Sequence, residues 1–265
     1  MPIKVIAFDA DDTLWDCQSH FEQVEEHLYS LIAPYCDDPK RELFKTESAN
    51  MADLGYGCKA FTISIIETAL RIAGNDLSAT QLSELLAHSK QLLHLPATPL
   101  PGVEQTLRTL RQRIEEEDFG GGWRVEGGGR IPEGQELFSS APPPSSLHQK
   151  SPSAPKLVVF TKGELQDQEN KLKRSGLLRY FDDVEITSDK GQAEFLALCE
   201  HQQIHPSELL MVGNSLKSDI APALAIGAWA IHIPFYVTWQ LETFDDFDHE
   251  RMVKVDHFAD ILNYI

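Results

Sequence analysis

The stretch Lys4-Val5-Ile6-Ala7-Phe8-Asp9-Ala10-Asp11-Asp12-Thr13 decides how the rest of this sequence is interpreted. Its apolar part, residues 5–8, has the length of a strand. The abrupt change to carboxylates after it is typical of a strand that is buried on both faces of a parallel sheet. Such sheets bind their ligands beyond the carboxyl ends of the strands, where Asp9 and Asp11 would lie. The alternative is an Asp-rich turn after a strand, because Asp is a common turn residue.

The composition is that of a globular chain without a membrane-spanning segment. Its 265 residues are enough for one large domain or two ordinary ones, and 42% of them are hydrophobic. No apolar run approaches the roughly 18 residues that cross a bilayer, and the first expected strand starts too early to leave room for a signal peptide. Four scattered Cys without metal spacing indicate free thiols in a reducing compartment. We therefore expect a cytoplasmic protein, and the net charge of −18 argues against nucleic acid or an anionic membrane as its partner.

Residues 16–97 are predicted to be almost entirely helical and to form a lobe of their own. Apolar residues recur at helical spacing in four segments, which are residues 20–33, 40–51, 60–73 and 78–93. Breakers rich in Pro, Asp and Gly separate these segments, and three prolines between residues 96 and 101 end the block. A further helix is expected from residue 103 to about residue 117.

Residues 118–155 depart from this pattern. They contain two Gly-Gly-Gly runs, a Pro-Pro-Pro run and several Ser, with too few apolar side chains to offset the entropy of ordering the segment. We interpret them as a disordered insertion that emerges on the side opposite the strand carboxyl ends. The alternative is a Gly-rich phosphate-binding loop, but no strand–helix frame surrounds these glycines.

Short apolar strands then alternate with helices. Strands are expected at residues 157–160, 184–186, 209–212 and 229–233, with helices near residues 166–175, 192–201 and 219–226 between them. This alternation implies βα units with right-handed crossovers. With the first strand it predicts an α/β fold with a mostly parallel five-stranded sheet. Residues 1–15 and 98–265 would build this core, and residues 16–97 would be a separate helical lobe inserted into it.

Polar side chains suited to phosphoryl transfer follow the first four strands. Asp9 could be a nucleophile, and Asp11 a general acid and then a base. Thr161 offers a hydroxyl and Lys190 an ammonium to a phosphoryl group. Mg²⁺ prefers oxygen ligands, and the fourth strand is followed by two residues that offer them, Asn214 and Asp219.

Each of these residues also has a purely structural alternative. Lys162, which directly follows Thr161, is a rival to Lys190, and either could be a solvated surface Lys. The Thr161 hydroxyl could bond only its local backbone. Asp219 could merely cap the helix that begins there, and Asn214 could be a simple turn residue.

This series of motifs resembles the haloacid dehalogenase (HAD) superfamily in its phosphatase branch. Asp9-Ala10-Asp11-Asp12-Thr13 resembles the first motif, DxDxT, while Thr161 resembles the second and Lys190 the third. Gly213-Asn214-Ser215-Leu216-Lys217-Ser218-Asp219 resembles the fourth, usually GDxxxxD. The first and fourth motifs together are specific, whereas the second and third are weak alone.

The resemblance implies a Rossmann-like three-layer core, a covalent phosphoryl intermediate on Asp9 and an essential Mg²⁺. The metal ligands would be Asp9, the backbone carbonyl of Asp11, and Asn214 or Asp219. The phosphate of a small phosphorylated metabolite would be bound by Thr161, Lys162, Gly163 and Lys190. The helical lobe resembles a C1-type cap that closes over the site, with residues 14–17 and 97–102 as hinges and the loop 54–59 near the substrate.

Two features depart from the pattern. Asn214 stands where the fourth motif usually has Asp, so we expect weaker metal binding, and the insertion at 118–155 is foreign to the family.

His232 and Trp239 are expected to pack rather than react.

The main expectation is a Mg²⁺-dependent phosphomonoester hydrolase. A phosphomutase, a 2-haloacid dehalogenase and a non-catalytic ligand-sensing domain stay open, although dehalogenation needs no second acid and Asp11 therefore argues against it. The sequence does not indicate the oligomeric state.

Overall fold

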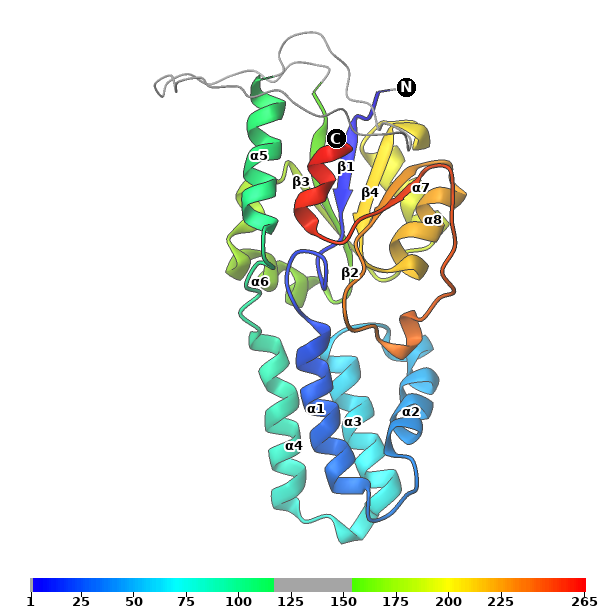
Figure 1. Ribbon diagram of the computed structural model, residues 1–265. Coiled ribbons are helices and arrows are strands. Elements are labelled where there is room, and N and C mark those ends of the chain that lie inside the picture. The colour runs from blue at the N-terminus through cyan, green and yellow to red at the C-terminus, as the bar shows by residue number, and fades with distance from the viewer. Residues whose placement is uncertain (1, 117–153) are drawn as a thin grey trace.

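The computed structural model describes residues 2–116 and 154–265, and it contains a six-stranded sheet whose paired strands are all parallel. The strand order is β3-β2-β1-β4-β5-β6. Because β1 lies between β2 and β4, the first strand of the chain is central in the sheet (Figure 1). The strands are β1 (Val5–Phe8), β2 (Lys156–Lys162), β3 (Asp183–Thr187), β4 (Leu209–Gly213), β5 (Trp229–His232) and β6 (Met252–Lys254).

The predicted α/β class is confirmed, but the predicted count of five strands is wrong. The additional strand, β6, pairs in parallel with β5 at the edge of the sheet. It has only three residues, and none of them is fully buried. A segment this short carries no periodicity, so the sequence offers no signal for it.

Alternate residues of β1 show why the core has three layers. Ile6 and Phe8 pack on one face of the sheet, against α5 (Val103–Glu116), α6 (Leu165–Ser175) and the short C-terminal helix Phe258–Asn263. Val5 and Ala7 pack on the other face, against α7 (Gln192–His201) and α8 (Ala221–Ala225). Residues 5–8 include no polar residue because both faces of the sheet are buried at β1. Each large apolar side chain buried in this way contributes about 1.5–3 kcal/mol to stability.

Four helices between β1 and the rest of the sheet pack around a hydrophobic cluster of their own. They lie beyond the carboxyl ends of the strands (Figure 1), and we refer to them as the cap. Ser78 and Gln81 form a capping box at the start of the fourth helix, and Asp38 caps the second, which begins with Pro39. The cap helices are α1 (Gln18–Ile32), α2 (Pro39–Leu54), α3 (Cys58–Ala73) and α4 (Ala79–Gln91).

The two segments that join the cap to the sheet are bonded to each other. Trp15 forms a bridge with Pro99, and the Leu100 amide donates a hydrogen bond of 2.9 Å to the Leu14 carbonyl. These are the segments that we expect to act as hinges, and that role stays a prediction.

The region after β4 differs in detail from the expected single helix at 219–226. The chain first makes a π-helical turn, Leu216–Ile220, and α8 then spans only Ala221–Ala225. Pro222 lies in the first turn of α8, where its missing N–H is not needed. This Pro begins a new helix and so breaks the predicted one in two.

The predicted insertion at 118–155 lies almost entirely outside the described residues. Before it, α5 ends at Glu116, and after it, β2 begins at Lys156. In the part of the chain that the structure describes, no helix combines the length and apolar character needed to span a bilayer.

Candidate active site

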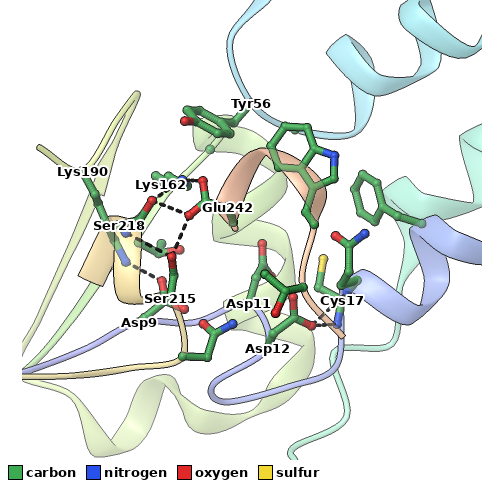
Figure 2. Close-up of a pocket in the computed structure, with 18 of the residues that line it drawn as sticks. Asp9, Asp11, Asp12, Cys17, Tyr56, Lys162, Lys190, Ser215, Ser218 and Glu242 are labelled. Atoms are coloured by element: carbon green, nitrogen blue, oxygen red, sulfur yellow. Dashed lines mark hydrogen bonds and ion pairs between the residues drawn. The ribbon is translucent and has the colours of Figure 1, made fainter. Parts of the chain in front are cut away.

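A cavity of about 350 Å³ lies between the carboxyl edge of the sheet and the cap. Asp9 and Asp11 follow β1, Thr161 and Lys162 end β2 with Gly163 directly after it, and Asn214 and Asp219 follow β4. All the residues predicted for the site line this one cavity, because parallel strands place their carboxyl ends at the same edge. The cap contributes the opposite wall, including Tyr56 from the loop between α2 and α3 (Figure 2).

Lys190 joins the ends of β1 and β4 through a buried group of charges. Its ammonium forms ion pairs with Asp9 and, at 2.8 Å, with Asp219. All three residues are at most 7% exposed. Burial, aided by the Asp219 carboxylate, raises the pKa of Asp9 to about 7 despite the opposing effect of Lys190. Lys162, the rival candidate, makes no such contact with Asp9 among the described residues.

Gly213 allows Asp219 to reach this group. A Cβ atom at position 213 would collide with the Asp219 carboxylate. The Oδ2 atom of Asp219 accepts a hydrogen bond of 2.9 Å from the Ser215 amide. Both Asp219 oxygens are therefore engaged, one by Lys190 and one by the backbone.

The side chains of Asp9 and Asn214 converge on the Thr13 hydroxyl. Thr13 Oγ1 lies 3.1 Å from Asp9 Oδ2 and 3.1 Å from Asn214 Oδ1. One hydroxyl proton cannot satisfy both acceptors fully. His232 holds the Asn214 backbone, because its Nε2 atom lies at hydrogen-bond distance, 2.9 Å, from the Asn214 carbonyl oxygen. Burial lowers the pKa of His232, which favours the neutral ring. Asp9 Oδ2 and Asn214 Oδ1 therefore share one donor, the Thr13 hydroxyl.

This arrangement fits a divalent cation with oxygen ligands. Eight acidic side chains but only three lysines line the cavity, so its charge is strongly negative. Asp9 and Asn214 present oxygens that a cation could take. The carboxylates of Asp219 and Asp11, by contrast, have their own protein partners. A separate group of possible metal ligands, Asp183, Glu185 and His201, begins at the opposite end of β3 and does not line the cavity.

Asp11 is held by three side chains that the sequence did not reveal. Lys171 donates to both of its oxygens at 2.7 and 2.9 Å, Gln168 donates at 2.8 Å, and the Trp15 indole donates at 2.7 Å. Burial alone would raise the pKa of Asp11, but Lys171 and the two other donors outweigh burial and lower it. Lys171 is only 2% exposed and lies 3.2 Å from the buried Asp167. The only sequence signal for it is a Lys at an inward position of a short helix.

Asp12 has a structural role. It has a left-handed backbone, with φ of 64°, and one of its oxygens accepts hydrogen bonds from the Cys17 and Gln18 amides at 2.8 and 2.9 Å. The Asp-rich turn that we considered as an alternative is therefore present too, formed by the third carboxylate of the motif.

The end of β2 is partly engaged by the protein itself. Thr161 is buried and lines the cavity. The Lys162 ammonium pairs with Glu242, lies 2.7 Å from the Ser218 hydroxyl and stacks 3.9 Å over the Tyr56 ring. The Gly163 amide donates to the Thr187 carbonyl at 2.9 Å.

Glu242 organises this side of the cavity (Figure 2). It accepts hydrogen bonds from the hydroxyls of Ser215 and Ser218 at 2.7 and 2.6 Å in addition to its ion pair with Lys162. Three residues earlier in the same segment, Trp239 packs on the Tyr56 ring and donates to Glu47 of α2 at 3.4 Å. The sequence did not identify Glu242, and it predicted for Trp239 only packing.

The comparisons with known proteins support the fold. A haloacid dehalogenase-like family hydrolase from Xanthomonas campestris superposes with a TM-score of 0.73 at 24% identity, over 98% of this chain and 88% of that one. A HAD phosphatase from Thermococcus onnurineus has a TM-score of 0.56 at 19% identity, over 98% and 97% of the two chains. A 2-haloacid dehalogenase from Pseudomonas syringae has a TM-score of 0.55 at 19% identity, over 99% and 97%.

This chain therefore has the fold of the haloacid dehalogenase-like hydrolases, as its motifs predicted. At these identities the likeness establishes the architecture and leaves the reaction to be argued from the site. No protein-family model matches the sequence, and neither does any curated protein.

Replacing Lys171 by Met tests the role of this buried cation. We expect Lys171→Met to lower the free energy of unfolding at pH 7 by about 3 kcal/mol, because Asp11 and Asp167 then lose their buried partner. The stabilisation of Asp11 is present above the ordinary Asp pKa of 3.8 and is lost as the pH falls through its lower folded value. The difference between wild type and variant should therefore shrink toward pH 3, as measured by urea denaturation.

Lys173→Met is the matched control, because Lys173 lies on the same helix and is exposed. Its effect should stay below about 0.5 kcal/mol. A Lys171→Met deficit that does not change with pH would show that lost packing, rather than charge pairing, is responsible.

Proposed function

We propose that this protein is a Mg²⁺-dependent phosphomonoester hydrolase that acts on a small phosphorylated metabolite through a phosphorylated Asp9. The observation that carries the proposal is the environment of Asp9, a buried carboxylate between Lys190 and Thr13 in a cavity that also contains a second carboxylate, Asp11. A cavity of about 350 Å³ suits a small molecule.

In the first half of the proposed reaction, Asp9 attacks phosphorus. One carboxylate oxygen of Asp9 forms the new bond to phosphorus, and Lys190, which pairs with Oδ1, keeps the side chain in place. The bond between phosphorus and the ester oxygen breaks, and the leaving alkoxide takes a proton from Asp11. Thr161 and Lys190 are the residues that we assign to the transferred phosphoryl group.

In the second half, Asp11 accepts a proton from water, which attacks phosphorus and breaks its bond to Asp9. Inorganic phosphate leaves, and the carboxylate of Asp9 is restored. Without substrate, Lys171 keeps the pKa of Asp11 low. To act first as an acid, Asp11 must gain a proton as the anionic phosphate enters, since a nearby like charge raises a carboxyl pKa.

Mg²⁺ would be held by Asp9 and Asn214, with the Asp11 carbonyl and Asp219 as the further ligands that the motif resemblance implies. When bound, it neutralises phosphoryl oxygens, and it keeps Asp9 ionised in a strongly negative cavity.

Among the alternatives, a 2-haloacid dehalogenase has some structural support, because one of the similar structures has that name. That reaction uses the same nucleophile but has no need of a second carboxylate. The three donors that hold Asp11 in the cavity therefore favour phosphate ester hydrolysis. A phosphomutase would use the same two carboxylates, and a ligand-sensing domain would need neither as a catalyst.

The basic test is hydrolysis of p-nitrophenyl phosphate by the purified protein with Mg²⁺ and with EDTA. We expect turnover with Mg²⁺ only. Asp9→Asn removes the nucleophilic carboxylate while keeping the shape of the side chain, and it should reduce kcat by about a thousandfold or more. Activity that survives EDTA or this substitution would refute the mechanism.

Asn214→Asp tests the predicted metal ligand. An added negative charge should bind Mg²⁺ more tightly, and we expect half-maximal activity at a roughly tenfold lower Mg²⁺ concentration, equivalent to about 1.4 kcal/mol. Asn75→Asp adds the same charge at an exposed site in the cap and should change nothing. An unchanged Mg²⁺ dependence of Asn214→Asp would remove this residue from the metal site.

A further inference from the structure

The cap wall of the cavity contains two carboxylates that the proposed reaction does not use. Glu25 of α1 and Glu47 of α2 both line it. Neither belongs to the four motifs, and their position on the cap places them where the non-phosphate part of a substrate would lie. They therefore bear on which alcohol the phosphate is attached to.

Glu47 is buried without an adequate partner. It is only 7% exposed. Its Oε2 atom receives a long hydrogen bond of 3.4 Å from the Trp239 indole, and within the described part of the chain its Oε1 atom accepts none. Burial, followed by the charge of Glu25, raises the pKa of Glu47 to about 7. A buried carboxylate in this state gains most from a ligand that brings a positive charge.

Glu25 adds a second negative charge at the same wall. It accepts a hydrogen bond of 2.9 Å from the Tyr29 hydroxyl, and burial raises its pKa. Among the residues described, no Lys or Arg of the cap lines the cavity. The cavity's three lysines are engaged elsewhere, since each is paired with a carboxylate of the core.

Aromatic rings complete this end of the cavity. Phe21 and Phe61 pack together with ring centroids 4.8 Å apart, and Tyr56 and Trp239 do so at 5.9 Å. All four line the same cavity as the two Glu residues. Aromatic faces attract ammonium groups, and one of them already does so here, because the Lys162 ammonium stacks on Tyr56.

We propose that the cap end of the cavity binds a positively charged group, and that the substrate is a phosphate monoester of an amino alcohol with a primary or quaternary ammonium. This inference rests on the proposed phosphatase function and specifies its substrate class. The ester would lie with its phosphate at Asp9 and its ammonium among Glu25, Glu47 and the aromatic rings. The cavity's excess of negative charge disfavours an anionic leaving group at this position.

The test compares pairs of substrates that have the same shape and differ in charge. Phosphocholine and 3,3-dimethylbutyl phosphate differ only in having nitrogen or carbon at the branched end. We expect the wild type at pH 8, where Glu47 is ionised, to hydrolyse phosphocholine with a kcat/KM about tenfold higher or more. Glu47→Gln should lower this ratio severalfold, because it keeps the side chain's shape and removes its charge, while Glu25 and the aromatic rings remain.

Glu26→Gln is the matched control, because Glu26 is an exposed residue on the same helix as Glu25. The ratio should not change in this variant. Circular dichroism checks that Glu47→Gln is folded, and Glu25→Gln, which is expected to lower the ratio as well, is an independent second variant.

The outcomes separate this inference from the proposed function. Hydrolysis of p-nitrophenyl phosphate without a preference for phosphocholine would refute the inference and leave the phosphatase function standing. A preference that Glu47→Gln does not alter, or faster hydrolysis of glycerol phosphate than of phosphocholine, would also refute it. The last result would indicate that the cap binds neutral hydroxyls.

If no ester is hydrolysed, the phosphatase proposal fails, and the cation site is judged by binding alone. Trp239 lines the cavity, so choline binding to the wild type can be measured by tryptophan fluorescence. Binding that is weakened at least fivefold by Glu47→Gln would support a cation site. The absence of choline binding would refute it.

Discussion

The buried ammonium of Lys190 joins three segments at the carboxyl edge of the sheet. It lies between Asp9 at the end of β1 and Asp219 after β4, while its own backbone follows β3. Three separate segments thus meet at one charge that is almost fully removed from water. Removing one member of such a buried group typically costs about 3–5 kcal/mol, because the others are left uncompensated. The geometry of the candidate nucleophile and the stability of this edge therefore depend on the same contacts.

Much of this site could be predicted from the sequence because parallel strands have a simple geometry. Once residues 5–8, 157–160, 184–186 and 209–212 are taken as strands of one parallel sheet, the polar residues that follow them must meet at one edge. That reasoning placed Asp9, Thr161, Lys190 and Asn214 correctly around one cavity. It could not say how the charges pair, because this depends on side-chain directions at the edge.

The residues that the sequence did not reveal come from helices and irregular segments. Lys171 and Gln168 reach Asp11 from α6, and a Lys within a short helix is indistinguishable from a surface residue until the helix is packed. Glu242 and Trp239 belong to the segment between β5 and β6, which has little regular structure. The contact of Glu242 with Lys162 joins positions 80 residues apart, and that of Trp239 with Glu47 joins positions 192 residues apart; no local pattern encodes such contacts.

The segment between β5 and β6 suggests how proteins with this fold could change their substrate specificity. Through Glu242 it bonds the lysine at the end of β2, and through Trp239, three residues earlier, it bonds a carboxylate of the cap. One surface loop therefore contacts both ends of the cavity, although it contributes none of the motif residues. Changes in its length or sequence could alter which molecules fit without disturbing the sheet or the four motifs, so this loop is a natural place for specificity to evolve and to be engineered.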